Sequence, residues 1–485
     1  MNPLFARKTV ASTDAEAAKH SLKRSLGAFD LTALGIGAII GAGIFSSTGT
    51  AAAGGGAHVG AGPALSISYL LTAVACGFAA MCYAEFASMI PIAGSAYTYA
   101  YVTLGELVAW IIGWDLILEY AIGNVAVAVS WADYLNDFLA GIGLHFPVWM
   151  ATTMDRAHQH PEIFAAAPHL FGIPIVINLP AFAIIAALTA VLVIGMRESA
   201  WINSVIVVLK LALVLGFIGV GFFYVKPENW HPFAPNGFRG IMSGASLIFF
   251  AYIGFDAVST TAEEAKNPQR DLPIGMIASL IVCTVLYIAV TLVLTGMVSY
   301  KDLAVGDPLA VALHAAGLEK LAGVLSAGAV IAMTAVLLVF QMGQSRIFMS
   351  MARDGLLPKV AARIHPRFRT PHVTTMITGA CVAIPAMFVD INDAIEFTNI
   401  GTLFAFAIVS VGVIVLRYKE PNRARPFRCP WVPVVPLLSV GCCIALMCYL
   451  PLITWLRFIG WLALGLLVYY LYGRKHSVLR GNPPR

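Results

Sequence analysis

The residues of this chain that could do chemistry are a few ionisable side chains inside long apolar segments. Lys210 lies near the middle of one such segment, and Asp256 ends a second apolar run. Asp115 and Glu119, in a third, are four residues apart and therefore share a helical face. If these segments lie in a bilayer, a Lys at a helix centre costs about 2.5 to 3.5 kcal/mol, so Lys210 must be buried against protein and paired. Ionisable groups in such positions are typical of proton or ion pathways.

Glycines interrupt two of the apolar segments. Gly35, Gly37, Gly41 and Gly43 fall within residues 35–45, and another glycine interrupts the run 249–256. A glycine in a helix interior costs roughly 1 kcal/mol relative to Ala. Irregular backbone at membrane depth is tolerated only where it is buried in protein or lines a cavity. Paired interruptions in two halves of a chain indicate a midplane binding site of the kind found in transporters.

Other kinds of site have little support. The sequence contains no His-Glu-x-x-His, no Gly-x-Ser-x-Gly and no Gly-rich phosphate loop ending in Lys-Ser/Thr, so we expect no enzyme. His158 and His160 form a His-x-His pair, but no Cys or second acidic cluster at ligand spacing accompanies them. We therefore expect a solvated loop there, no metal site and no cofactor.

The elements that position these residues are membrane helices. The chain has 485 residues, of which 59% are hydrophobic and only 11% charged, which leaves too little polar surface for a water-soluble fold. An apolar run of about 20 residues is long enough to span a bilayer as a helix, and the sequence has about twelve candidates. The fold class is therefore predicted to be all-α and integral to the membrane.

The two interrupted segments divide the chain into repeats. We expect a cytoplasmic tail at 1–28, a first repeat of helices 1 to 5 at 29–225, and a second repeat of helices 6 to 10 at 226–418. Residues 419–485 then provide helices 11 and 12 and a C-terminal tail. The third segment is long and is expected to run from Ala96 to about Ser130.

The basic residues predict the topology. With the N-terminus inside, most of the 30 Lys and Arg residues fall in the tails and loops of the inner side. This fits the positive-inside rule with both termini cytoplasmic. The longest outer stretch is expected at about 136–179. Arg457, on a helix outside the repeats, is expected to face lipid or to snorkel. The location is predicted to be the plasma membrane, the inner membrane of a bacterium.

Five motifs resemble bacterial members of the cationic amino acid transporter family, within the amino acid-polyamine-organocation superfamily. The run Glu-Glu-Ala-Lys-Asn-Pro-Gln-Arg-Asp-Leu-Pro at 263–273 is the most family-specific of them. The others lie at 35–45, 195–199, 252–259 and 351–358. The resemblance implies two inverted five-helix repeats of the leucine-transporter kind, in which helices 1 and 6 are broken.

The resemblance also implies a substrate site at the two breaks. Backbone N–H groups would hold the substrate carboxylate, as at any helix N-terminus, which offers unpaired donors and about half a positive charge. Carbonyl groups of helix 6 would hold the ammonium group. Relatives often have Thr in place of Ala42, so one hydroxyl donor is absent here. The residues that match are Ile40, Gly41, Ala42 and Gly43 for the carboxylate, and Phe250, Ala251 and Ile253 for the ammonium.

Lys210, Glu119 and Asp256 are expected to take part in proton coupling. In sodium-coupled relatives a cation lies between helices 1 and 8, and the resemblance suggests that the Lys210 ammonium takes its place on freed carbonyl groups of helix 1. The alternative for Lys210 is a static salt bridge with Glu119, Asp115 or Asp256. For Glu119 and Asp256, a purely structural hydrogen-bonding role is the alternative.

These patterns predict a secondary active transporter that moves L-amino acids by alternating access, with a proton as the coupling ion. Exchange, and a channel or nutrient-sensing receptor on a transporter fold, are the alternatives. The expected pocket residues are mostly apolar. A substrate with a charged side chain would find no partner for it there, and binding would cost several kcal/mol of desolvation. Neutral substrates are therefore favoured over cationic ones. Ala has the side-chain size to test first. The bilayer and the amino acid are the expected partners, and nucleic acid is not.

Overall fold

The computed structural model describes residues 26–480, apart from 56–57, 90–94, 196–199 and 369. The tail at 1–25 and most of the 195–199 motif lie outside the described residues. Within them, eight helices are long and apolar enough to cross a membrane, one bent pair forms a further span, and three shorter apolar helices accompany these. They occupy the places of the twelve segments expected from the sequence, and the prediction of an all-α membrane protein is confirmed.

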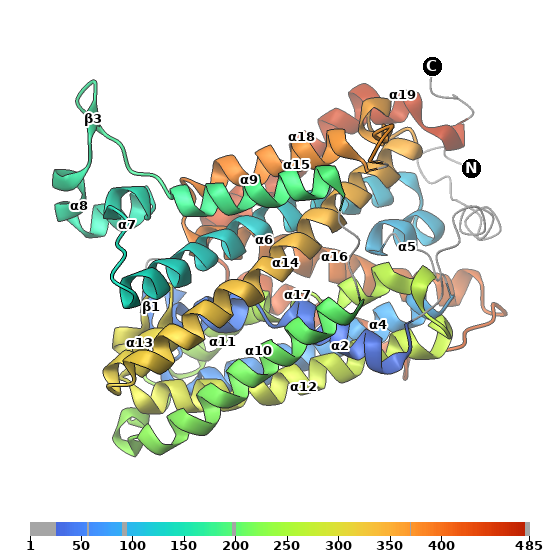
Figure 1. Ribbon diagram of the computed structural model, residues 1–485. Helices are drawn as coiled ribbons and strands as arrows, with labels where there is room; N and C mark the ends of the chain where they lie inside the picture. Colours follow the sequence, from blue (N-terminus) through green and yellow to red (C-terminus); the bar gives the residue numbers. More distant parts are fainter. Residues whose placement is uncertain (1–25, 56–57, 90–94, 196–199, 369, 481–485) are drawn as a thin grey trace.

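The described chain is largely helical (Figure 1). The α-helices are α2 (Ala28–Ile39), α3 (Thr48–Ala53), α4 (Leu65–Met89), α5 (Ser95–Thr103), α6 (Glu106–Gly141), α7 (Met154–Gln159), α8 (Pro161–Ala166), α9 (Leu179–Ile194), α10 (Ala200–Gly221), α11 (Gly237–Ile248), α12 (Pro268–Met297), α13 (Pro308–Ala315), α14 (Glu319–Arg353), α15 (His372–Ala386), α16 (Ile391–Lys419), α17 (Val434–Cys448), α18 (Leu452–Val468) and α19 (Arg474–His476). Two short antiparallel pairs join β1 (Gly54–Gly55) to β2 (His58–Val59) and β3 (His169–Leu170) to β4 (Ile173–Pro174). Figure 1 places α7, α8 and α13 at one end of the molecule and α5 and α19 at the other.

Helix 1 breaks within the glycine-rich run. α2 ends at Ile39, the π-helical turn η2 covers Gly43–Ser47, and α3 continues the outer piece, with a bend of 43° between the two pieces. Ile40, between them, is extended, with φ −74° and ψ 102°. The last carbonyl groups of α2 and the first N–H groups of η2 therefore lack their usual helical partners.

Helix 6 breaks in a similar way. α11 is followed by the 3-10 turn η7 (Phe249–Tyr252), and a second 3-10 segment, η8, covers Asp256–Glu264. Gly254, between them, has φ +125°, a conformation that favours glycine. A Cβ atom on Gly43 would lie 2.3 Å from the Cα atom of Ala251. The two breaks are therefore packed directly against each other, backbone to backbone.

The third segment, expected from Ala96 to about Ser130, contains two helices. α5 ends at Thr103, Gly105 has φ +105°, and α6 begins at Glu106. Glycine adopts this left-handed conformation at no steric cost, so the chain turns there before the long helix starts. α6 then continues to Gly141, so the outer stretch begins later than residue 136.

Helices from the two halves of the chain pack in pairs. α12 lies along α2 and α4, α6 lies along α14 and α16, and α9 lies along α15. Small residues allow close approach, as where Gly275 meets Leu31 and Gly379 meets Thr189. Such contacts are typical of helix packing in membranes. This arrangement brings the broken helices 1 and 6 together in the interior.

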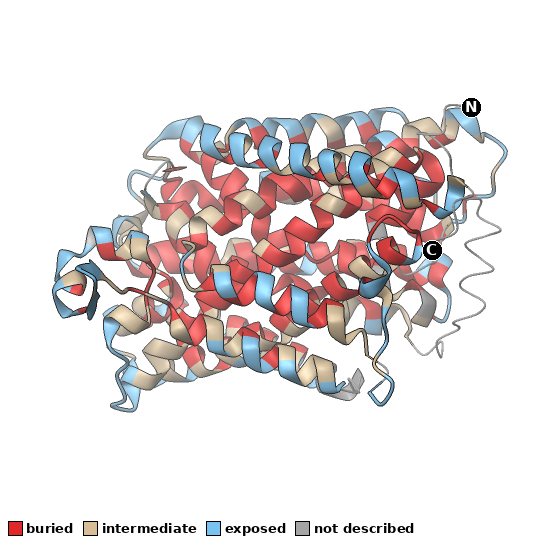
Figure 2. Ribbon diagram, turned by 90° about the horizontal axis from the view of Figure 1, so that it is seen from above, coloured by how far each residue is buried: buried red, intermediate tan, exposed pale blue. Residues whose placement is uncertain are grey.

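The surface along the helices is apolar. Buried residues fill the centre of the molecule in Figure 2, and exposed residues follow the outer helices. Val208, Leu215, Val285 and Leu456 are all more than half exposed. Apolar patches of this extent on a soluble protein would mark an interaction surface. On helices long enough to span a bilayer, they are the faces that contact lipid.

Candidate functional site

The break in helix 1 leaves N–H groups free at the start of its outer piece. The N–H groups of Ile44 and Phe45 donate to the Gly41 carbonyl at 3.2 and 3.3 Å. Gly41, Ala42 and Gly43 come before these donors, and none of their N–H groups makes a backbone hydrogen bond within the described chain. Unpaired N–H groups at a helix N-terminus form a favourable site for an anion such as a carboxylate.

Ile40 differs from the three residues that follow it. Its N–H group donates to the Ile36 carbonyl at 2.9 Å, so it still belongs to the hydrogen-bond ladder of α2. The free donors therefore begin at Gly41, one residue later than the resemblance implies.

Two side chains bind the carbonyl groups that the break in helix 1 leaves free. Lys210 Nζ donates to the carbonyl oxygens of Gly37 at 2.5 Å and of Ile40 at 2.9 Å, and Lys210 is almost completely buried. The Tyr287 hydroxyl lies 2.9 Å from the Ile39 carbonyl oxygen and 3.1 Å from that of Ala251. Tyr287 therefore links the break in helix 1 to the break in helix 6.

The carbonyl groups expected to hold an ammonium group have different partners. Phe250 O accepts the Ile253 N–H at 3.3 Å, and Ala251 O shares the single Tyr287 hydroxyl proton with the Ile39 carbonyl. The Ile253 carbonyl has no donor among the described groups. A carbonyl oxygen has two lone pairs, so all three can still accept a hydrogen bond from a substrate.

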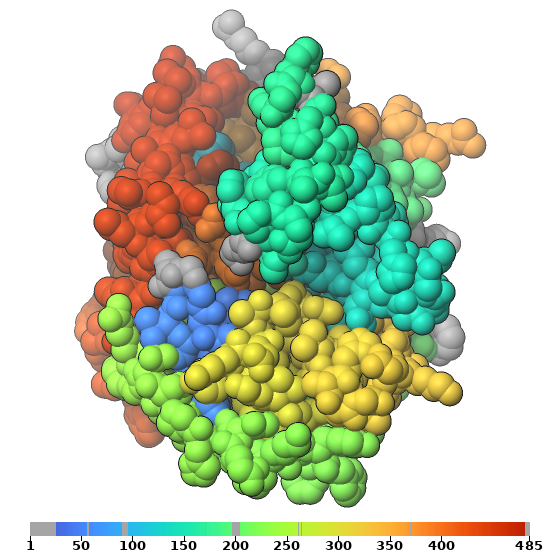
Figure 3. All heavy atoms as spheres, turned by 90° about the vertical axis from the view of Figure 1, so that its left-hand side faces the viewer, coloured from blue at the N-terminus to red at the C-terminus, as the bar shows by residue number. Residues whose placement is uncertain are grey.

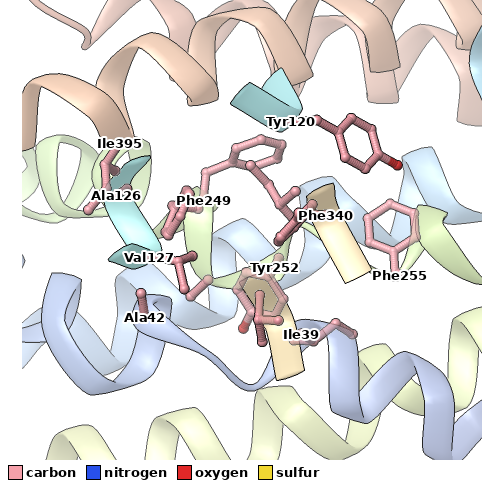
Figure 4. Close-up of a cluster of buried hydrophobic side chains, with 14 of the residues drawn as sticks. Ile39, Ala42, Tyr120, Ala126, Val127, Phe249, Tyr252, Phe255, Phe340 and Ile395 are labelled. Atoms are coloured by element: carbon pink, nitrogen blue, oxygen red, sulfur yellow. The ribbon is translucent and has the colours of Figure 1, made fainter. Parts of the chain in front are cut away.

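Apolar side chains from several helices meet beside the break in helix 1 (Figure 4). Ala42 of helix 1, Val127 of α6, Phe249 of helix 6 and Ile395 of α16 are all buried there, with Phe340 of α14 nearby. None of these side chains carries a charge. The surroundings of the free N–H groups therefore suit an aliphatic group and offer no carboxylate to a cationic one.

The three buried acids do not pair with Lys210. The carboxylates of Asp115 and Glu119 have no hydrogen-bond partner within the described structure, and Asp256 Oδ1 accepts the Gly254 N–H at 3.2 Å. Lys210 contacts carbonyl oxygens instead. The alternative of a static salt bridge between Lys210 and one of these acids is therefore wrong, because helix 1 itself supplies the acceptors.

Several residues that hold the breaks were missed by the sequence analysis. Besides Tyr287, Asn399 of α16 donates to the Ser246 and Leu247 carbonyl oxygens at 2.8 and 2.9 Å. Tyr134 of α6 donates to the Phe45 carbonyl at 2.6 Å. Buried polar groups must find partners. A Tyr or Asn inside an apolar segment was therefore the available signal, although the sequence does not show which carbonyl each one meets.

A cluster of charged groups lies at the end of the molecule that carries α13. Figure 3 looks onto this end, where the yellow residues around α13 meet the teal outer stretch. Arg156 of α7 donates to both carboxylate oxygens of Asp133, at 2.8 and 2.9 Å. Burial raises the pKa of Asp307 to about 7; Asp133 and Asp137 raise it as well, and Arg156 opposes them.

Polar contacts also join α16 to α18. His58 Nε2 lies 2.5 Å from Glu396 Oε1, and Thr454 donates to the other carboxylate oxygen at 2.6 Å. Arg457 forms an ion pair of 3.0 Å with Asp393. The expectation that Arg457 snorkels or faces lipid did not include this partner: an acid on the neighbouring helix binds its guanidinium group.

Known proteins that are similar to this chain are named as transporters and permeases. Residues 26–468 match the family model described as amino acid permease. The chain is 50% identical over 479 residues to a methylthioribose transporter of Bacillus subtilis, covering 99% of this chain and 100% of that protein. It is 49% identical over 471 residues to a branched-chain amino acid permease of the same organism, covering 97% of both. A vacuolar cationic amino acid transporter 4 of Arabidopsis thaliana is 38% identical over 430 residues, 87% of this chain and 68% of that protein.

Proposed function

Because the chain belongs to the amino acid permease family of transporters, we propose that it imports neutral L-amino acids with aliphatic side chains, coupled to protons. The proposal includes a location in the plasma membrane with both termini in the cytoplasm. The observation that carries it is the group of free N–H donors at 41–43, which lies beside a buried surface of uncharged apolar side chains.

The backbone at the two breaks suits the α-amino acid group. A carboxylate placed at Gly41 to Gly43 would receive charge-assisted hydrogen bonds, which are roughly twice as strong as neutral ones. An ammonium group at the helix 6 break would meet the carbonyl of Ile253, which has no donor among the described groups. Recognition by backbone atoms does not depend on the substrate side chain, so selectivity falls to the neighbouring side chains.

The side chains beside the break favour an aliphatic substrate. Ala42, Val127, Phe249 and Ile395 are buried there and carry no charge. A cationic side chain placed among them would lose its hydration without gaining a partner, at a cost of several kcal/mol. The 49% identity to a branched-chain amino acid permease supports the same substrate class.

Proton coupling is proposed to depend on Lys210. Its ammonium binds one carbonyl group of α2, that of Gly37, and one in the break, that of Ile40. Any movement that tilts α2 away from α10 would remove these acceptors and leave the ammonium desolvated and unpaired, a costly state. The proton on Lys210 would then leave in one conformation and return in the other, and Glu119 and Asp256 are the two further buried acids proposed to take part in its route.

A methylthio sugar is the second candidate substrate, favoured by the 50% identity to a methylthioribose transporter. Such a molecule has hydroxyl groups and a thioether but no carboxylate or ammonium group. The apolar surface beside Ala42 suits a methylthio group. The free N–H groups at 41–43 would, however, bind a neutral hydroxyl more weakly than a carboxylate, so we place this candidate second.

Uptake by purified protein in liposomes tests the proposal. Labelled L-isoleucine is offered with and without an inward proton gradient, and unlabelled L-leucine, L-alanine, L-arginine, isobutylamine or methylthioribose is added as competitor. We expect accumulation only with the gradient, and strong competition by L-leucine and L-alanine. Isobutylamine lacks the carboxylate and should not compete.

Other results of this uptake assay would favour one of the alternative functions or substrates. Uptake that requires a preloaded amino acid and ignores the proton gradient would show exchange, and a flux that never exceeds equal concentrations would show a channel. Competition by methylthioribose alone would favour the sugar. Tight binding of L-arginine without any effect of L-alanine would mean that an acid reaches the pocket, and Glu119 would be the first residue to test.

A further inference from the structure

A groove of about 590 Å³ lies on the outer face of α12, near the start of that helix. One wall consists of Ile274, Ile277 and Ile281, which follow one helical face of α12. The opposite wall consists of Pro426 and Phe427, from the loop that follows α16. Ile274 is 40% and Ile281 59% exposed, so the apolar floor of the groove is open to the surroundings.

The loop that forms the second wall is fixed by buried hydrogen bonds. Arg417 donates to both carboxylate oxygens of Glu85, at 3.0 and 2.7 Å, and the Cys429 N–H donates to the same carboxylate at 2.8 Å. Arg425 donates to the Glu420 carbonyl at 2.7 Å. Glu85 is fully buried. These contacts hold the loop away from α12, so the groove is a built feature of the fold.

One basic side chain lines the groove, and two more basic residues lie next to it in the sequence. Arg270 lines it, Arg428 directly follows one of its wall residues, and Lys266 lies two residues before the start of α12. All three are exposed, and among the described residues none has an acidic partner. Asp271, in the same helical turn as Arg270, is buried, and its Oδ2 accepts a backbone N–H at 3.2 Å. The mouth therefore presents positive charge.

The geometry points to a binding site for one anionic phospholipid. Its phosphate group lies beside Arg270, and an acyl chain follows Ile274 to Ile281 along the apolar floor. The floor offers nothing to a free phosphate ion, and the mouth offers nothing to an uncharged hydrocarbon. Basic clusters at the end of a membrane helix are favourable places for anionic lipid headgroups.

Lipid at this site would act on the broken helix 1 through α12. The opposite face of α12 packs on α2, where Gly275 meets Leu31 and Ser279 meets Gly35. The chain just before α2 is also tied to the chain just before α12, because the Lys266 N–H donates to the Leu26 carbonyl at 2.8 Å. A bound lipid therefore supports the helix against which the inner half of helix 1 rests.

Lipid binding by the purified full-length protein tests this inference. The protein in detergent is titrated with phosphatidylglycerol or phosphatidylcholine, bound lipid is counted by native mass spectrometry, and the unfolding temperature is followed. We expect one tight site for phosphatidylglycerol, with a rise in unfolding temperature, and no such site for phosphatidylcholine. Arg270→Gln should weaken the site about fivefold, which corresponds to about 1 kcal/mol for one basic residue at an anionic surface.

Two further variants separate the contribution of the apolar groove to lipid binding from the contribution of the basic charges. Ile277→Trp should fill the groove and remove the tight site while leaving the cations in place. Arg346→Gln is the matched control, since this exposed arginine lies away from the groove, seven residues before the end of α14. Equal binding of the two lipids, or equal effects of Arg270→Gln and Arg346→Gln, would overturn the inference. So would unchanged binding by Ile277→Trp. Because neither readout requires transport, such a failure is distinct from a failure of the proposed function.

Discussion

At the scale of single residues, Lys210 depends on an interruption in another helix. The carbonyl group of Ile40 is a free acceptor only because helix 1 stops being helical there, and the Lys210 ammonium lies 2.9 Å from it. A regular helix would pair this oxygen with its own N–H group four residues later. The charge on Lys210 and the shape of helix 1 therefore stabilise each other.

Lys210→Ala should abolish proton-driven accumulation. One proton that enters down about 100 mV releases about 2.3 kcal/mol, and at 1.36 kcal/mol per factor of ten this supports roughly fifty-fold accumulation of a neutral substrate. The variant should only equalise substrate across the membrane of liposomes with an imposed gradient. Substrate-induced thermal stabilisation checks that the variant still binds. A folded, substrate-binding variant with unchanged pH dependence would remove Lys210 from the coupling mechanism.

Gly43→Ala should disrupt the contact between the two breaks. The added Cβ would lie 2.3 Å from Ala251 Cα, so one backbone must shift. Overpacking of this kind costs about 1 to 3 kcal/mol, and the shift would misplace the N–H donors, so substrate affinity should fall at least tenfold in a thermal-shift titration. Gly77→Ala is the control, because nothing lies within 4 Å of a Cβ there. Equal affinity in both variants would show that the contact is not needed for binding.

At the scale of elements, the sequence predicted the breaks in helices 1 and 6. It did not predict several of the side chains that bind the backbone at those breaks. Glycines at 35, 37, 41 and 43 mark a helix that cannot stay regular, and the break falls at Ile40, among them. The break before α6 was missed, although Gly105 followed by an acid at Glu106 is a helix-start signal. Apolar periodicity continues across this turn and hides it.

A single sequence does not identify contacts between segments that are far apart in the chain. His58 and Glu396 are 338 residues apart and meet only because β2, which contains His58, lies beside α16. The same holds for Tyr287, whose hydroxyl reaches two breaks at once. Helical periodicity predicts which residues share a face of one helix, but the partner of that face depends on how the helices pack.

The α13 end should lose stability as the pH rises. The pKa of Asp307 is about 7 in the folded protein, through burial and then Asp133 and Asp137, against its usual value near 4 when unfolded. The folded state therefore holds this proton more tightly, and stability falls between about pH 4 and pH 7 as the pH increases. Asp307→Asn should be the more stable protein at pH 8, and its unfolding temperature should fall less from pH 5 to pH 8.

Asp302→Asn is the matched control for this pH dependence. Asp302 is exposed and stands only five positions earlier in the same outer loop. Its substitution should leave the wild-type pH profile unchanged. The explanation through Asp307 is refuted if Asp307→Asn and Asp302→Asn have the same difference in unfolding temperature between pH 5 and pH 8.

At the scale of the whole molecule, the two ends differ in charge. The acids Asp133, Asp137 and Asp307 gather at the end that carries α13, where Arg156 alone is close enough to Asp133 for an ion pair among the described groups. The opposite end has the exposed Arg270 at the lipid groove and the exposed Arg353 at the end of α14. A membrane with anionic lipid on its cytoplasmic side attracts the basic end.

This asymmetry predicts that Lys266 and Arg353 lie in the cytoplasm and His158 outside. Single cysteines at these three exposed positions are introduced after replacing the exposed native cysteines Cys381 and Cys448 by Ser. An impermeant thiol reagent should label only the variant with cysteine at 158 in intact cells, and all three after permeabilisation. Labelling at 353 in intact cells would invert the topology. The lipid groove would then open toward the outer leaflet, and the Asp307 cluster would respond to cytoplasmic pH.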